Sequence, residues 1–111
     1  MTNEDALAIF FKLIGIEETV RNDSYWLGKL WNNVSICWCG MDRPEKALEA
    51  SEKAIEYDDS RSVHFYNRAI AYRDLGRRAE AKADFKKTLE LDPTDDDAKD
   101  ELAKLKKRKA R

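Results

Sequence analysis

Apolar and small residues recur three or four positions apart along most of the chain, which is the spacing of one face of an α-helix. The pattern is clearest over residues 65–93, where Gly76 separates two such rows and Pro93 ends the second. Glycine readily adopts the left-handed conformation that closes a helix, whereas proline cannot continue one. The stretch therefore predicts two helices folded back on each other. Such a short hairpin cannot bury both of its apolar faces alone, so it requires neighbours.

The same periodicity predicts further helices on both sides of this hairpin, and no strand pattern occurs. They are expected at about residues 4–14, 24–39, 43–57 and 96–111. The fold class is therefore all-α. The first helix is apolar almost all round, which is typical of a helix that is well buried or covers another molecule. The sequence does not fix where this helix ends: it either breaks at Gly15 or continues towards Asn22.

Residues that commonly cap helices stand near the expected starts. Asn3 would cap the first helix and Thr94 the last, and residues 22–24 form a cluster of cap residues before the second. Asp42, followed three residues later by Glu45, indicates a capping box for the third helix.

Composition favours one small domain without a strong charge. The chain has 111 residues, of which 39% are charged and 42% hydrophobic, and its formal net charge is −1. This balance produces no overall field that attracts nucleic acid, so a nucleic-acid partner is not expected. No apolar run approaches the roughly 20 residues of a bilayer span, and no signal-peptide pattern begins the chain. A cytoplasmic location is therefore expected.

No cluster of reactive or metal-binding side chains is apparent. The single histidine, His64, has no cysteine, serine or acid at a motif spacing. Cys37 and Cys39 stand two residues apart on one predicted helix, so their side chains diverge and are interpreted as reduced thiols. We therefore expect neither a cofactor nor a metal site, and predict that the chain is not an enzyme.

An internal repeat organises the central part of the chain. Residues 28–61 align with residues 62–95 at a shift of 34 positions. Identical pairs recur along both copies: Asn33/Asn67, Ile36/Ile70, Arg43/Arg77, Ala47/Ala81, Lys53/Lys87, Glu56/Glu90 and Asp58/Asp92. Large packing positions keep their character, as in Trp31/Phe65. A helix–turn–helix unit that repeats every 34 residues is the signature of a helical solenoid.

At these residues the chain resembles the tetratricopeptide-repeat family, whose pattern is W-x2-L-G-x2-Y, then A-x3-F, then P. The second copy carries the pattern at Phe65, Ala69, Tyr72, Gly76, Ala81, Phe85 and Pro93. The first copy departs from it at Ser51, where an aromatic residue is usual, and at Asp59, where proline is usual. The resemblance implies a right-handed superhelix of helical hairpins. Its predicted parts are an N-terminal apolar helix within 1–23, repeats at 28–61 and 62–95, and a capping helix at 96–111.

The resemblance also implies a protein–protein interaction module, an adaptor or scaffold, that binds a peptide segment of a partner in a concave groove. The groove would be lined by the first helix of each repeat. Carried over to this sequence, its ligand-binding residues are Asn32, Asn33, Ile36, Tyr66, Asn67, Ile70, Arg73, Glu101 and Lys104. The asparagines lie off the aromatic packing faces, and their amides can donate to and accept from the backbone of an extended peptide. The alternative is a homodimer formed through the apolar N-terminal helix.

A well-known groove of this family grips the C-terminal carboxylate of heat-shock chaperones that end in EEVD. It uses lysine and asparagine on the groove helix of the first repeat, asparagine on that of the second and two basic residues on that of the third. Asn67 fits this pattern, whereas Asn32 and Ile36 replace the first lysine and asparagine. Asp97 and Glu101 replace the basic pair and would repel a carboxylate. The sequence therefore predicts a basic or neutral partner segment and argues against an EEVD tail.

Overall fold

The structure is a computed structural model that describes residues 1–109. These residues form six α-helices and no strand, which confirms the all-α fold class. The helices are α1 (Asn3–Val20), α2 (Ser24–Gly40), α3 (Pro44–Tyr57), α4 (Ser62–Asp74), α5 (Arg78–Leu91) and α6 (Asp96–Lys109). The last two residues of the predicted final helix, 110 and 111, lie outside the described part of the chain.

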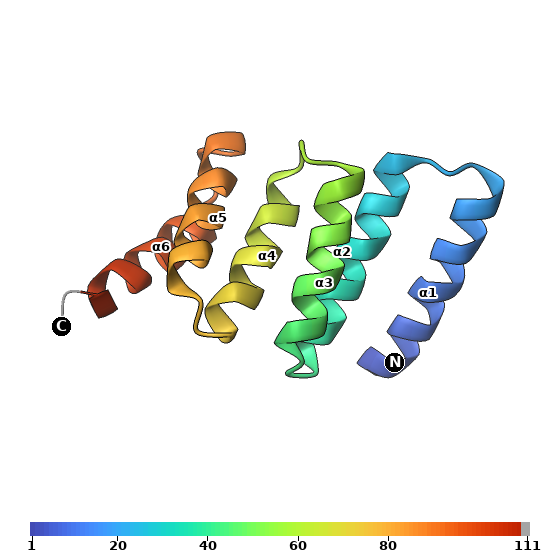
Figure 1. Ribbon diagram of the computed structural model, residues 1–111, viewed down its shortest axis with the longest axis horizontal. Helices are drawn as coiled ribbons and strands as arrows, with labels where there is room; N and C mark the ends of the chain where they lie inside the picture. Colours follow the sequence, from blue (N-terminus) through green and yellow to red (C-terminus); the bar gives the residue numbers. More distant parts are fainter. Residues whose placement is uncertain (110–111) are drawn as a thin grey trace.

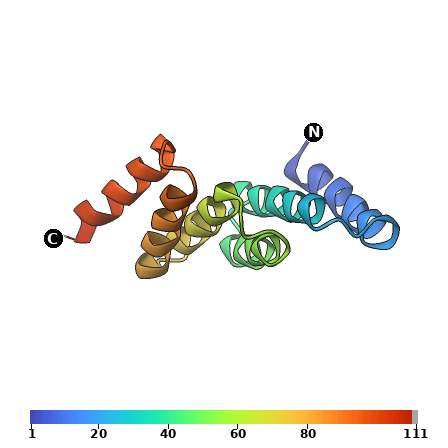
Figure 2. The same cartoon turned by 90° about the horizontal axis from the view of Figure 1, so that it is seen from above.

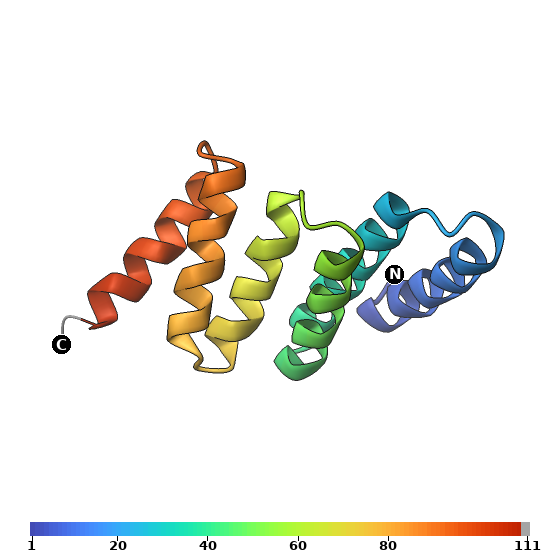
Figure 3. The ribbon, with the colours of Figure 1, turned by 45° about the horizontal axis from the view of Figure 1, so that its top comes forward.

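The helices stack one after another into an elongated array of 50 × 27 × 20 Å (Figure 1). Each helix packs on the next one along the chain, and α2 also touches α4 directly. Figure 3 shows the same order from another direction, with α1 and α6 at opposite ends. Seen from above, α3 lies below α2, so the two helices of a hairpin face opposite sides of the array (Figure 2).

The first two helices begin at side chains that satisfy free backbone N–H groups. Thr2 caps α1 through a capping box in which its hydroxyl accepts from the N–H of Asp5 while the Asp5 carboxylate accepts from that of Thr2. The expected cap Asn3 is thus off by one residue. Asp23 caps α2 as expected. Helix α1 continues through Gly15 to Val20, so the first helix does not break at this glycine.

Two predicted caps are wrong. Asp42 has a positive φ of 58°, and α3 starts after Arg43 without a side-chain cap, so no capping box forms. At α6 the N–H of Ala98 donates to the carboxylate of Asp95 at 3.0 Å. The hydroxyl of Thr94 instead donates to Asp92 at 2.7 Å, within the preceding turn. Sequence spacing alone does not distinguish neighbouring cap residues, since each turn decides which side chain faces the free N–H groups.

The core consists of two apolar clusters, one at each half of the array. The first joins α1, α2 and α3 through Leu7, Ile14, Leu27, Val34, Cys37 and Ala50. The second joins α4, α5 and α6 through Ala69, Ala81, Phe85, Ala98, Leu102 and Leu105. Fully buried alanines, Ala47 on α3 and Ala81 on α5, let neighbouring helices approach closely.

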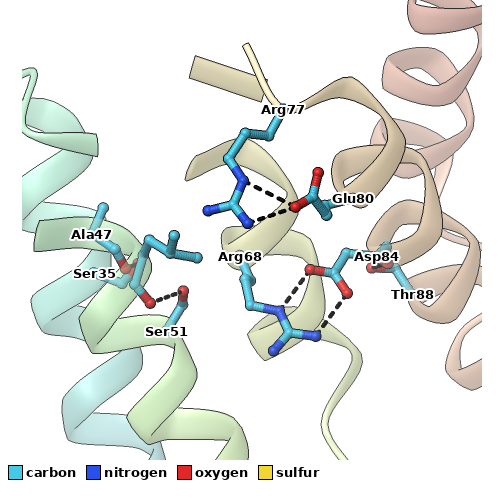
Figure 4. Close-up of polar contacts among 9 residues, drawn as sticks. Ser35, Ala47, Ser51, Arg68, Arg77, Glu80, Asp84 and Thr88 are labelled. Atoms are coloured by element: carbon cyan, nitrogen blue, oxygen red, sulfur yellow. Dashed lines mark hydrogen bonds and ion pairs between the residues drawn. The ribbon is translucent and has the colours of Figure 1, made fainter. Parts of the chain in front are cut away.

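Two serine hydroxyls in this core are paired locally. The buried hydroxyl of Ser35 donates to the carbonyl of Ala47 at 3.0 Å and so ties α2 to α3 (Figure 4). Ser51, which stands where the second repeat has the buried Phe85, donates to the carbonyl of Leu48 at 2.9 Å. The departure from the repeat pattern at Ser51 therefore leaves no unsatisfied hydroxyl in the core.

Candidate functional site

The predicted groove residues lie on α2, α4 and α6, whose exposed side we call the α2/α4/α6 face. Asn32, Asn33 and Ile36 come from α2, Tyr66, Asn67, Ile70 and Arg73 from α4, and Glu101 and Lys104 from α6. Two polar contacts cross the junctions between these helices. The Asn67 amide nitrogen donates to the Asn32 amide oxygen at 2.8 Å, and Arg73 donates to Glu101 at 2.8 Å. The residues thus form a continuous band across three helices.

The asparagines of this band differ in their availability to a ligand. Asn32 is only 7% exposed and is held by Asn67, so the prediction that it lies off the packing surface is wrong. Its neighbour Asn33 is half-buried, and its side chain makes no hydrogen bond within the described residues. Asn33 therefore keeps an amide donor and an acceptor for a peptide backbone.

The apolar and aromatic members also divide into packed and free side chains. Tyr66 lies edge-on against Phe85 with ring centroids 5.6 Å apart, and both Tyr66 and Ile70 pack on the cluster of α5 and α6. Ile36 is 48% exposed and projects from α2. Of the predicted groove residues, Ile36 is thus the one that offers apolar surface to a partner.

The charged members form a local ion pair next to a small cavity. Arg73 bridges Glu101 and Asp74 at 2.8 and 3.0 Å. A cavity of about 380 Å³ beside this pair is lined by Arg73, Glu101, Lys104, Leu105 and Lys107. The carboxylate of Glu101 is therefore neutralised within the protein, and the end of the face carries lysines as well as acids.

A cluster that the predicted groove residues do not include lies at the start of α2. The ammonium of Lys29 is 5.5 Å from the ring centroid of Tyr25 and 5.0 Å from that of Trp26. The guanidinium of Arg61, just before α4, is 5.2 Å from the Tyr25 ring. Hydrogen bonding with Arg61, and then the charge of Lys29, hold the pKa of the Tyr25 hydroxyl below its usual value. Helical periodicity gives no signal for Arg61, because this residue stands in a turn.

The histidine and the two cysteines are buried or half-buried. His64 is 1% exposed, and its Nδ1 lies 2.9 Å from the carbonyl oxygen of Asp58. Cys37 and Cys39 are free thiols whose pKa values are raised by burial. Among the described residues no group of three or more potential metal ligands occurs. None of the described helices is long and apolar enough to cross a membrane.

Comparison with known proteins identifies the repeat. The family model for the tetratricopeptide repeat matches residues 63–95, which span α4, α5 and the turn after them. The first tetratricopeptide-repeat domain of Spaghetti (RPAP3), bound to the HSP90 peptide SRMEEVD, superposes with a TM-score of 0.86 at 21% identity, over 98% of this chain and 83% of that one. The chain belongs to the tetratricopeptide-repeat family. The predicted boundaries of its repeats, at 28–61 and 62–95, stay a prediction.

Further proteins are similar to this tetratricopeptide-repeat chain in fold or in sequence. The second such domain of human RPAP3, in complex with the HSP70 peptide SGPTIEEVD, has a TM-score of 0.75 at 27% identity and covers 95% of this chain and 92% of that one. FK506-binding protein-like of Mus musculus is 33% identical over 68% of this chain, and heat shock protein STI1 of Saccharomyces cerevisiae 28% over 89%. The chain spans only 22% and 16% of these two relatives.

The argument against an EEVD tail is wrong. Two structural neighbours of this tetratricopeptide-repeat chain hold peptides that end in EEVD, and STI1 is among its relatives. The prediction rested on two acids, Asp97 and Glu101. Arg73 neutralises Glu101, whereas Asp97 is exposed and forms no ion pair within the described residues. Self-association through α1 stays a prediction, because α1 packs on α2 through Leu7 and Ile14 and still exposes apolar side chains.

Proposed function

We propose that this chain is a protein-interaction module that binds the acidic C-terminal tail of an HSP70 or HSP90 chaperone along its α2/α4/α6 face. The observation that carries the proposal is the 27%-identical domain that holds the HSP70 peptide SGPTIEEVD and matches 95% of this chain. In a longer protein the module would act as an adaptor, joining the chaperone to whatever the rest of that protein binds.

The free groups of the face suit an extended acidic peptide. Asn33 offers an amide to the peptide backbone, Ile36 an apolar surface, and Lys104 a cation that forms no ion pair in the described residues. The pair between Arg73 and Glu101 removes the repulsion that a free Glu101 would exert on a carboxylate. The predicted groove residues thus enter the proposal in two roles, as ligand contacts and as the framework that holds them.

A binding role without catalysis is part of the same proposal. The one histidine is buried against a backbone carbonyl, so it is not placed to act as a base towards a ligand. No cofactor is invoked. The two thiols are unpaired, which suits a reducing compartment such as the cytoplasm.

Fluorescence anisotropy with a labelled nonapeptide that ends in Glu-Glu-Val-Asp tests the proposal. We expect saturable binding that weakens when the C-terminus is amidated and when both glutamates are replaced by glutamine. Asn33→Ala should reduce affinity, whereas Asn3→Ala, an exposed amide at the start of α1, should not. Absence of binding to HSP70 and HSP90 tails by folded protein, with helicity verified by circular dichroism, would overturn the proposal.

A further inference from the structure

The start of α2 carries two cations that share one aromatic support. Tyr25 and Trp26 lie edge-to-face with centroids 5.3 Å apart, and both are 42% exposed. Lys29 lies over both rings, and Arg61 approaches Tyr25 from the turn before α4. We call these four residues the aromatic–cation cluster. The rings restrict the positions of the two cationic side chains. Less side-chain conformational entropy is therefore lost when these cations bind an anion.

The two cations have no acidic partner of their own. Neither Lys29 nor Arg61 forms an ion pair within the described residues. Of the acids near in sequence, Asp23 accepts from the N–H groups of Tyr25 and Trp26, and Asp58 accepts from Ser60. Asp59, two positions before Arg61, is exposed and forms no ion pair with it. Arg68, by contrast, meets a carboxylate at 2.7 Å. The aromatic–cation cluster therefore presents positive charge that the protein does not neutralise by direct contact.

An apolar cavity adjoins the same cluster. It has a volume of about 380 Å³ and is lined by Leu13, Ile16, Glu17, Val20, Arg21, Trp26 and Leu30. Its one carboxylate, that of Glu17, is held by Arg21 at 2.7 Å and by the N–H of Asp23 at 3.2 Å. Ile16 and Val20 expose 52% and 73% of their surface there. Since Trp26 belongs to both the cavity and the cluster, an apolar site and a cationic site share a wall.

We infer that this junction binds an acidic segment in which an aliphatic side chain immediately precedes acidic residues: the aliphatic group enters the cavity beside Trp26, and the carboxylates contact Lys29 and Arg61. The inference rests on the function proposed above, and it assigns the acidic side chains of the tail to the start of α2. Both tails named there have this character, with Met or Ile followed by two glutamates. The positive charges favour acidic residues by charge complementarity, and the apolar cavity favours an aliphatic side chain immediately before them.

The assignment predicts a specific loss on removing the two charges. Lys29→Gln together with Arg61→Gln should weaken the acidic nonapeptide about tenfold or more, as expected when charge-assisted hydrogen bonds are lost. The dependence of affinity on salt should become shallower as well, because fewer charges pair on binding. Lys12→Gln together with Lys86→Gln removes the same charge from exposed positions on α1 and α5 and serves as the matched control.

A thermodynamic cycle between protein and peptide gives the decisive measurement. Wild-type protein should distinguish the Glu-Glu peptide from its Gln-Gln counterpart, and the Lys29/Arg61 variant should bind the two alike. Replacing the preceding Ile by Ser in the peptide should weaken binding to wild type and much less to an Ile16→Ser variant. Helicity and melting of each variant establish that the fold is intact.

The outcomes separate the two proposals. If wild type binds no chaperone tail, the proposed function fails and this inference falls with it. If wild type binds the tail, and the Lys29/Arg61 variant keeps both its affinity and its preference for Glu over Gln, the inference fails while the proposed function stands.

Discussion

The side-chain amide of Asn67 donates a hydrogen bond to the amide oxygen of Asn32 at 2.8 Å, and this bond joins α4 to α2 across the junction between the two repeats. Asn32 is 7% exposed, so its oxygen has little access to water. Helix α2 also carries the free groups Asn33 and Ile36 and the cation Lys29. The amide pair is thus a direct polar link between these two helices.

Asn67→Ala should destabilise the fold by about 1 kcal/mol, because it leaves a nearly buried acceptor on Asn32 without a donor. For a chain of this size the melting temperature should fall by about 4–8 °C. Asn33→Ala, one position along, is the matched control and should leave the melting curve unchanged while reducing peptide affinity. A double-mutant cycle on Asn32 and Asn67 should give a coupling energy of similar size. Equal melting of all variants would show that the amide pair contributes nothing.

Arg68 and Asp84 form the most buried ion pair in the described structure, with bonds of 2.7 and 2.9 Å between α4 and α5 (Figure 4). The Asp84 side chain is 8% exposed and that of Arg68 24%. Asp84→Leu should cost about 2 kcal/mol, less than the loss of a fully buried pair, because water partly screens Arg68. Adding Arg68→Leu should restore most of the stability in urea denaturation. A double variant with a lower free energy of unfolding than Asp84→Leu alone would contradict this explanation.

Periodicity in the sequence was sufficient for the fold and for its family. The apolar rows, Gly76 and Pro93 predict helices whose ends the structure reproduces within a few residues, and Gly76 has the expected positive φ of 79°. This succeeds because helix faces repeat at a fixed local spacing. Caps such as Asp95 were missed, because they depend on the path of a single turn.

The site was less predictable, since it depends on contacts between residues far apart in sequence. Asn32 and Asn67 are both polar and on the predicted face, yet their mutual hydrogen bond is what buries Asn32. Arg73 and Glu101 look like isolated charges of opposite sign until α6 folds back on α4. Arg61 lies outside every periodic segment, so only the three-dimensional structure places it over Tyr25. Pairings of this kind decide which charges the protein leaves without a partner, and the spacing of residues in the sequence does not reveal them.

Ala81→Glu should unfold the second hairpin, because Ala81 is fully buried where α5 crosses α4, and a carboxylate there has no partner. Ala79→Glu makes the same change two residues away, at an exposed position of the same helix, and should melt like wild type. Circular dichroism at 222 nm measures the loss of helix in the first variant. A native melting curve for Ala81→Glu would mean that the two helices do not need close contact there.

Stability should fall in mild acid because of His64. Burial lowers the pKa of this imidazole, while its contact with the Asp58 carbonyl opposes the shift only in part. Since a carbonyl oxygen only accepts, Nδ1 carries the proton of the neutral ring. A second proton would bind at Nε2, which is buried and has no acceptor for the new N–H group. Its ring also fills the space beside Gly28, where an added Cβ would lie 3.1 Å from Cε1, so the ring has little room to move.

Because the folded-state pKa of His64 is depressed, the unfolded chain binds more protons once the pH drops below the unfolded value of about 6.5. The stabilisation is therefore fully present above that pH and declines as the pH falls towards 5. Melting temperatures of wild type should decrease over this interval more steeply than those of His64→Gln, although the variant starts from a lower value at pH 7.5. His64 is the only histidine, and the carboxylates are the same in both proteins, so the difference between the two slopes belongs to this residue. Parallel slopes would show that the folded protein tolerates the protonated His64 ring without loss of stability. Nε2 would then have to reach an acceptor through a local opening of the contact between α2 and α4.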